Sequence, residues 1–204
     1  AALTPTLLAA TYPDGLRTLI TGGEPFPPEL ARRWTRDHTL INSYGATETT
    51  VVSCADDPLT TVTDTPIPMG GPVRGFTVVV LDRMLRPVPT GVLGELYVSG
   101  PGLARGYHRQ PGLTAARFVP APYGPPGTRM YRTGDLVSWT ANHTLQYRGR
   151  SDRQLEVQGN RIEPGEVESA LRGHPDVTHA AVTVHTGPVG ADRLTGYIVP
   201  AANT

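Results

Sequence analysis

The chain has 204 residues, of which 38% are apolar and 18% are charged, and its 18 basic residues balance its 18 acidic ones. A chain of this length can bury a core in one or two domains. Zero net charge argues against nucleic acid or an acidic membrane as a partner, and no apolar run approaches the roughly 18 residues of a membrane-spanning helix. The single cysteine, Cys54, excludes an internal disulfide and fits a cytoplasmic location.

All the basic residues are arginine, because the chain contains no lysine. An arginine cannot replace a lysine ammonium as a compact point charge. No chemical step that needs a lysine ammonium can therefore be completed by these residues alone.

The first third of the chain alternates strand-like and helix-like segments. "LTPTLLAA" begins like a helix, with proline at its first position. Residues 16–24 form an apolar run that ends in two glycines, "PPELARRW" predicts a helix, and residues 38–45 form a second apolar run before a glycine. This order is typical of parallel strands joined by helices, so we expect both glycine loops to leave the same edge of a sheet.

The rhythm then changes to short strands separated by proline and glycine turns. The segments "FTVVVLD", "GELYVSG", "LVSW" and "TLQYRGR" predict an antiparallel, barrel-like region. We expect "YRTGDL" to form a turn that carries Asp135.

The last 55 residues or so predict a small α+β unit. "QLEVQGNRIE" alternates like a hairpin, and a helix follows with Val167, Ala170 and Leu171 on its apolar face. Two further strand-like runs complete the unit. We therefore expect an α/β layer over residues 1–65, a β-rich barrel-like part over 66–149, and a small, incomplete C-terminal domain over 150–204.

The stretch "INSYGATETT", residues 41–50, is a candidate site at the end of a predicted strand. Gly45 would let backbone amides approach a ligand, and Tyr44 offers a ring that can stack on a planar base. Glu48 is a single carboxylate among hydroxyls, which fits Mg²⁺ bound jointly with substrate phosphates. From this stretch alone, an ordinary polar loop is the favoured interpretation.

Other patterns are weaker or point away from common enzyme classes. "SGPGLARG" has the wrong spacing for a dinucleotide-binding loop and lies among predicted strands. The six histidines show no metal-ligand spacing, and no nucleophile elbow is present. Asp135, after a glycine, is a candidate acceptor for two ribose hydroxyls, although an aspartate that merely stabilises a turn is common.

Five motifs taken in order carry a family resemblance. They are "LITGGEPFPPELARRW", "INSYGATETT", "GELYVSGPGLARGYHRQPGLTAARF", "RMYRTGDLV" and "YRGRSDRQLEVQGNRIEPGEVESAL". They closely resemble successive core motifs of the adenylation domains of nonribosomal peptide synthetases, which belong to the adenylate-forming superfamily with acyl-CoA synthetases and luciferases. The resemblance covers essentially the whole chain and implies a fragment of the adenylate-forming fold.

The resemblance implies an ATP-dependent ligase that works as part of a larger protein. Such domains use ATP and Mg²⁺ to convert an amino acid to aminoacyl-AMP and pyrophosphate. They then pass the acyl group to the phosphopantetheine thiol of a carrier protein, next to other synthetase modules. Such a reaction depends on positioning and charge neutralisation more than on a protein nucleophile.

The resemblance also assigns residues to the nucleoside. Tyr44 matches the aromatic residue that stacks on adenine. Asn42 and the backbone of Gly22 and Gly23 match positions around the adenine edge. Asp135 matches the acceptor for the ribose hydroxyls, and Tyr147 flanks the nucleoside.

Further matched positions concern the phosphates and the moving domain. Thr47 matches the hydroxyl that touches phosphate, and Glu48 the carboxylate that binds Mg²⁺. Arg150 matches the arginine on the ribose or phosphate side. Asp152 matches the hinge about which the small domain rotates between the two half-reactions.

The amino-acid pocket is only partly represented. The matched pocket positions are Ile20, Gly22, Ser43, Val51 and Val52. None is charged, so we expect a neutral amino-acid side chain of small to medium size.

Three features of the family are missing or changed. The glycine-rich phosphate loop and the C-terminal lysine belong outside this segment. Within it, Glu156 stands where lysine is common, Asn160 replaces an aromatic residue, and Ala46 replaces a proline. We expect the 204-residue piece alone to be inactive. An acyl-CoA or aryl-acid ligase, and a degenerate non-catalytic binding module, remain alternatives.

Overall fold

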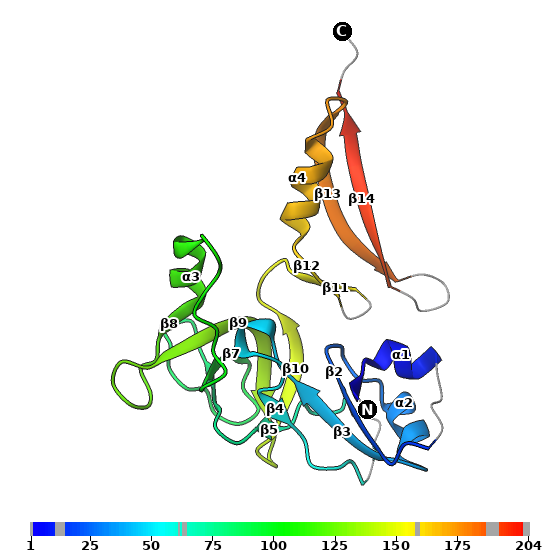
Figure 1. Ribbon diagram of the computed structural model, residues 1–204, viewed down its shortest axis with the longest axis vertical. Coiled ribbons are helices and arrows are strands. Elements are labelled where there is room, and N and C mark those ends of the chain that lie inside the picture. Colours follow the sequence, from blue (N-terminus) through cyan, green and yellow to red (C-terminus); the bar gives the residue numbers. More distant parts are fainter. Residues whose placement is uncertain are drawn as a thin grey trace. The chain divides into compact units, whose positions relative to one another are not determined.

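The computed structural model describes residues 2–10, 15–60, 62, 65–157, 160–186 and 192–201 (Figure 1). The chain divides into two compact units, Ala1–Ser151 and Asp152–Thr204, called unit 1 and unit 2 below. Among the described residues, no helix has the length and apolar character needed to cross a bilayer.

The first sheet of unit 1 has five strands in the order β1-β2-β3-β4-β5. Its strands are β1 (Ala2–Leu3), β2 (Thr18–Gly22), β3 (Thr39–Tyr44), β4 (Cys54–Ala55) and β5 (Gly71–Pro72). The first three are parallel and the last two antiparallel. Because Gly22 pairs with Ser43, the loops after β2 and β3 leave the same edge, which confirms the expectation from the sequence.

Two helices, α1 (Pro5–Ala10) and α2 (Pro28–Trp34), pack against one face of this sheet. The buried side chains between them are Leu8, Leu19, Phe26, Ala31, Trp34, Leu40 and Ile67. Since successive side chains of a strand point to opposite faces, Ile20, Gly22, Ile41 and Ser43 share the other face. Three predicted pocket positions therefore lie together.

The second sheet curls into a half-barrel. Its order is β10-β9-β7-β6, with β8 also paired to β9. Its elements are β6 (Thr77–Leu81), β7 (Gly94–Ser99), α3 (Pro111–Arg117), β8 (Phe118–Pro120), β9 (Arg129–Trp139) and β10 (Leu145–Arg150). The amide of Met69 donates to the carbonyl of Leu145 (2.7 Å), and the amide of Leu145 donates to the carbonyl of Gly70 (2.9 Å). These two bonds join the sheets, and the predicted fold class is confirmed.

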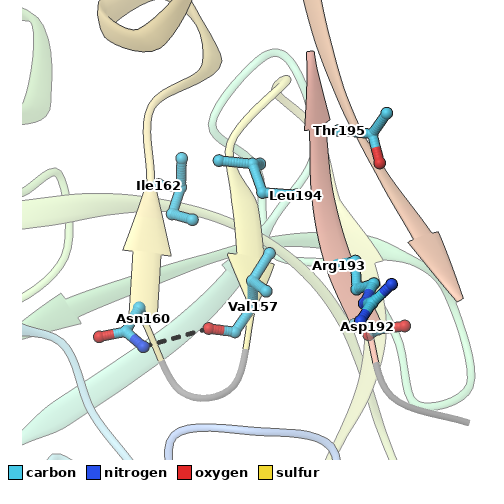
Figure 2. A pocket seen from close by; sticks show the side chains of 7 residues that line it. All are labelled: Val157, Asn160, Ile162, Asp192, Arg193, Leu194 and Thr195. Carbon is cyan, nitrogen blue, oxygen red and sulfur yellow. Dashed lines mark hydrogen bonds between the residues drawn. The ribbon is translucent and has the colours of Figure 1, made fainter. Parts of the chain in front are cut away.

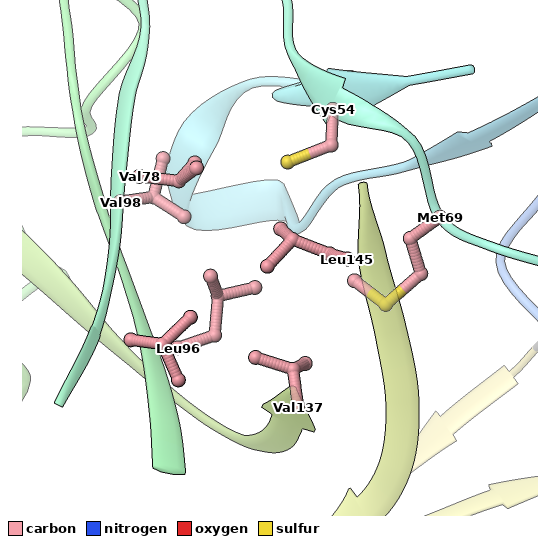
Figure 3. Close-up of a cluster of buried hydrophobic side chains, with 8 residues drawn as sticks. Cys54, Met69, Val78, Leu96, Val98, Val137 and Leu145 are labelled. Atoms are coloured by element: carbon pink, nitrogen blue, oxygen red, sulfur yellow. The ribbon is translucent and has the colours of Figure 1, made fainter. Parts of the chain in front are cut away.

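The half-barrel has an apolar core to which both sheets contribute (Figure 3). The buried members are Cys54, Met69, Val78, Val80, Leu96, Val98, Val137 and Leu145. Tyr44 and Tyr147 pack against this cluster. The strand that ends in the candidate loop is therefore anchored in the same core as the strands that carry Asp135 and Arg150.

The segment "YRTGDL" is not the turn expected from the sequence, because it lies inside β9. Glu95 of β7 pairs with Leu136 and Tyr97 pairs with Arg132, so β9 has extra residues between these pairs. Gly134 accommodates this bulge with a φ of 80°, and a bulge re-aims side chains within a strand. The strand thus continues through Gly134, and Asp135 lies in the middle of β9 rather than in a turn.

Unit 2 contains two hairpins and one helix. Its elements are β11 (Leu155–Val157), β12 (Asn160–Ile162), α4 (Pro164–Arg172), β13 (Val177–Thr186) and β14 (Asp192–Pro200). The buried residues of α4 are Pro164 and Glu168, whereas Ala170 is exposed. The expected apolar face was therefore wrong at Ala170. A charged residue, Glu168, occupies a buried position because it has partners there.

Cys54 provides a clean probe of folding because it is the chain's only cysteine. It is fully buried, and burial raises the pKa of its thiol to about 12. Only the thiolate is nucleophilic, so we expect no reaction with a thiol reagent at pH 8 in the native protein and one equivalent in denaturant. The experiment uses a full-length protein in which any cysteines outside this segment are replaced. Rapid labelling of its native state would contradict the described core.

Glu168 predicts a pH dependence in unit 2. The amide of Val182 donates to its carboxylate (3.1 Å), as does Arg153 (2.8 Å). These bonds, the Val182 bond above all, hold the pKa of Glu168 below its usual 4.5. Because the folded-state pKa is depressed, the stabilisation is present above the unfolded value and is lost as pH falls through the folded value.

We expect the Glu168→Gln variant to expose the Val182 amide to faster hydrogen exchange than the wild type at neutral pH. The difference should shrink as pH falls below 4.5 and through the lowered pKa of Glu168. Exchange rates corrected for intrinsic pH dependence measure this, with Glu166→Gln as a control on the exposed side of α4. A difference that is constant from pH 7 to pH 3 would show that the charge of Glu168 contributes nothing.

Candidate functional site

Two glycines shape the edge at which β2 and β3 end. A Cβ on Gly22 would clash with the carbonyl oxygen of Ser43, and one on Gly45 would clash with that of Val51. Any larger residue would push the neighbouring backbone away. The glycines are therefore required by close backbone packing, and the Ser43 hydroxyl adds a bond to the Thr21 carbonyl (2.9 Å).

The short helix η1 (Thr47–Thr49) carries the candidate carboxylate just past β3. Glu48 is only 6% exposed, whereas Thr47 is exposed. The Tyr107 hydroxyl donates to Glu48 Oε1 (2.7 Å), and the Ala104 amide donates to the Glu48 carbonyl (2.8 Å). Glu48 therefore has a fixed position on the loop predicted to bind nucleotide.

Asp135 is the meeting point of three predicted site residues. It is 7% exposed, the Tyr44 hydroxyl donates to Oδ2, and Arg150 Nη1 donates to Oδ1 (2.6 Å). Arg150 Nη2 also donates to the Thr133 carbonyl (3.1 Å). Burial, followed by the charge of Asp135, raises the pKa of Tyr44 well above its ordinary value, so Tyr44 acts here as a neutral donor.

The other predicted residues of unit 1 differ in burial and in contacts. Asn42 is buried, and its side-chain amide donates to the Pro68 carbonyl (2.6 Å), in the segment between β4 and β5. Tyr147 pairs with Val137 and packs on the barrel core. Val51 is 70% exposed, and Ile20 is exposed on the uncovered face of β2.

Asp152 is the first residue of unit 2, and its carboxylate accepts the Gln154 amide (3.2 Å). Gly23 has a φ of 85° and open space around its Cα, so it can approach a ligand through backbone alone. Val52 is half-buried in the segment between η1 and β4. These three positions take their roles from the resemblance.

Sequence reasoning missed two residues that hold the acidic groups. Tyr107 contacts Glu48 from 59 residues away. Thr133 accepts the amide of Asp135 at its hydroxyl (3.0 Å) while donating to the Leu96 carbonyl (2.8 Å). The tyrosine that ends "GLARGY" was visible in the sequence, but nothing local connects it with Glu48.

The donor set fits Mg²⁺ held jointly with phosphates. Among the described residues, no three His, Cys, Asp or Glu side chains gather into a ligand set for a metal. Mg²⁺ usually keeps several waters and takes one or two protein carboxylates plus substrate phosphates. The buried carboxylate of Glu48 beside the exposed hydroxyl of Thr47 meets that requirement.

A separate pocket of about 630 Å³ lies within unit 2 (Figure 2). The hairpin of β11 and β12 forms one wall, and the start of β14 forms the other. Its described lining residues are Val157, Asn160, Ile162, Asp192, Arg193, Leu194 and Thr195. They include none of the predicted site residues, so the candidate site is not this pocket.

Comparisons with known proteins agree with the motif order. Residues 3–108 match the family described as AMP-binding enzyme. The chain is 45% identical over 207 residues to novobiocin biosynthesis protein H of Streptomyces niveus, covering 100% of this chain and 34% of that protein. It is 47% identical over 205 residues to the dimodular nonribosomal peptide synthase of Bacillus subtilis strain 168, covering 98% of this chain and 9% of that protein.

A solved structure shows the same fold. The structure of holo-PA1221, an NRPS protein containing adenylation and PCP domains, superposes with a TM-score of 0.90 at 30% identity. The match covers 99% of this chain and 37% of that one. The chain thus spans between 9% and 37% of the lengths of these three proteins. It belongs to the AMP-binding enzyme family, and over this segment it is similar to proteins that contain nonribosomal peptide synthetase adenylation domains.

Proposed function

We propose that this segment supplies the nucleotide- and magnesium-facing side of an adenylation site that activates an amino acid. A substrate carboxylate oxygen attacks the α-phosphorus of ATP, the bond to pyrophosphate breaks, and aminoacyl-AMP forms. The observation that carries the proposal is the contact of Tyr44 and Arg150 with Asp135. These three residues come from motifs that lie far apart in the chain, and the resemblance assigns all three to nucleotide binding.

Asp135 is proposed to accept the ribose hydroxyls. A carboxylate has about four lone-pair sites, so its bonds to Tyr44 and Arg150 are compatible with a bound ribose. The Tyr44 ring, held at its hydroxyl, would offer a face to adenine, with Gly22, Gly23 and Asn42 around the base edge and Tyr147 beside the nucleoside. Arg150 would face the ribose or a phosphate.

Glu48 is proposed to bind Mg²⁺ and Thr47 to contact phosphate. When bound, Mg²⁺ would neutralise charge on the phosphates. The protein's own contribution is to present a carboxylate whose position is fixed before ATP arrives. Preorganisation of this kind avoids reorganisation during the reaction.

The substrate and partners are proposed on less direct grounds. Ile20, Gly22, Ser43, Val51 and Val52 are uncharged, which favours an amino acid with a neutral side chain. Solved relatives of the segment contain adenylation and PCP domains. A carrier protein with phosphopantetheine would therefore accept the acyl group, with Asp152 as the hinge, among other synthetase modules in the cytoplasm. The nonribosomal peptide synthase relative of Bacillus subtilis does not favour the acyl-CoA or aryl-acid ligase alternative.

The role of Glu48 is tested by Glu48→Gln in the full-length protein. We expect ATP–pyrophosphate exchange to fall by roughly 100-fold or more, because removing one preorganised electrostatic group costs about that much. The matched control is Glu29→Gln, at an exposed position of α2, which should leave exchange unchanged. Exchange within twofold of the wild type in Glu48→Gln would refute the assignment.

The role of Asp135 is tested by Asp135→Asn. A hydrogen bond to a charged group contributes about 1.5–3 kcal/mol, so we expect the Kd for ATP to rise roughly 10- to 100-fold. Equilibrium binding to the full-length protein measures this, with Asp57→Asn as the exposed control and circular dichroism as the check on folding. A folded Asp135→Asn protein with wild-type ATP affinity would contradict the proposal.

A further inference from the structure

The segment from Gly102 to Tyr107 contacts the Glu48 turn at several points. The Thr50 hydroxyl donates to the Gly102 carbonyl (2.8 Å), and the Ala104 amide donates to the Glu48 carbonyl (2.8 Å). A Cβ on Gly102 would lie 3.0 Å from the Thr49 carbonyl oxygen, so the two backbones pack closely. The main chain of this segment therefore holds the turn independently of the Glu48 side chain.

The turn needs this support because its last residue is strained. Thr50 has a φ of 79°, in a region that β-branched residues rarely adopt. Such a conformation is unfavourable and persists only where surrounding contacts impose it. The bond from Thr50 to Gly102 is one such contact, which makes the segment a determinant of the turn's shape.

Tyr107 adds a contact to the carboxylate itself, and its own position is fixed. Its amide donates to the Thr114 hydroxyl of α3 (2.9 Å), and its ring meets the edge of Phe118 with centroids 5.7 Å apart. The preceding Gly106 has a φ of 148°, and a Cβ there would clash with Thr114. The hydroxyl that reaches Glu48 Oε1 therefore has little freedom to move.

A neutral donor on one carboxylate oxygen restricts the rotation of the carboxylate and leaves its negative charge in place. The Tyr107 hydroxyl donates to Glu48 Oε1 over 2.7 Å, so it serves as the donor of this bond. Groups that orient a metal ligand in this way influence metal affinity without touching the metal.

We infer that Tyr107 is a positioning residue that orients Glu48 for a divalent cation, which would bind together with ATP. This inference rests on the proposed role of Glu48. Tyr107 would act through Glu48 and would contact neither ATP nor the amino acid.

The test is cation binding by the full-length protein with a non-hydrolysable ATP analogue, so that no turnover occurs. Mn²⁺ serves as the probe, and electron paramagnetic resonance measures the free ion. We expect Tyr107→Phe to raise the Kd for Mn²⁺ roughly tenfold, as for other residues that orient metal ligands, with kcat at saturating Mg²⁺ within about threefold of the wild type.

The matched control is Tyr97→Phe. Tyr97 is also buried, and its hydroxyl lies 3.4 Å from a carboxylate, that of Glu95, outside the candidate site. We expect this variant to bind Mn²⁺ like the wild type. A Kd in Tyr107→Phe within twofold of the wild-type value would overturn the inference.

A second variant covers the case in which Tyr107→Phe does not fold. Thr114→Val removes the acceptor of the Tyr107 amide, and we expect the Kd for Mn²⁺ to rise about threefold, in line with the loss of one hydrogen bond. An unchanged Kd would overturn the inference.

Glu48→Gln in the same titration separates the two proposals. If Glu48→Gln loses Mn²⁺ affinity and Tyr107→Phe does not, only the inference about Tyr107 is wrong. If Glu48→Gln binds Mn²⁺ like the wild type, the proposed metal site and the inference are both wrong.

Discussion

The buried carboxylate of Asp135 constrains how the two sheets of unit 1 pack together. A buried charge costs several kcal/mol unless it is paired and hydrogen-bonded. Asp135 meets both conditions through Arg150 on the neighbouring strand and Tyr44 on the other sheet. These partners can reach it only because the sheets are joined at Gly70 and Leu145 and share one apolar core. The packing of the half-barrel and the geometry of the candidate site are therefore one problem.

Glu48 follows the same logic in a more local form. Glu48 is buried on a short turn. The hydroxyl of Tyr107, in the segment between β7 and α3, donates to its carboxylate. In both cases an acidic side chain is held by a tyrosine from a distant part of the chain. The tyrosines stay protonated because burial raises their pKa values. Fixed acids with neutral donors suit a site that must receive a charged nucleotide without rearranging.

Local patterns predicted the elements well where one face of the segment is buried. The apolar runs of β2 and β3, the helix between them and the glycines after them predicted the parallel order, and the motif order predicted the family and fold. All of these predictions are confirmed. The bulge in β9 was not predictable, because "YRTGDL" has the composition of a turn and only pairing with β7 makes it a strand. The prediction that Ala170 lies on the buried face of α4 was wrong. Glu168, a charged residue, is buried there instead because Val182 on β13 and Arg153 before β11 bind its carboxylate. The contact between Tyr107 and Glu48 spans 59 residues, and no local periodicity encodes it.

Photolabelling with 8-azido-ATP tests the central claim, that the loop after β3 faces a nucleotide. With no lysine in the segment, trypsin cuts only after arginine, so Tyr44 and Glu48 fall in one peptide, residues 37–74. In the full-length protein we predict that this peptide carries the label and that excess ATP removes it. Labelling of other peptides alone, or labelling of residues 37–74 that ATP does not compete, would contradict the account.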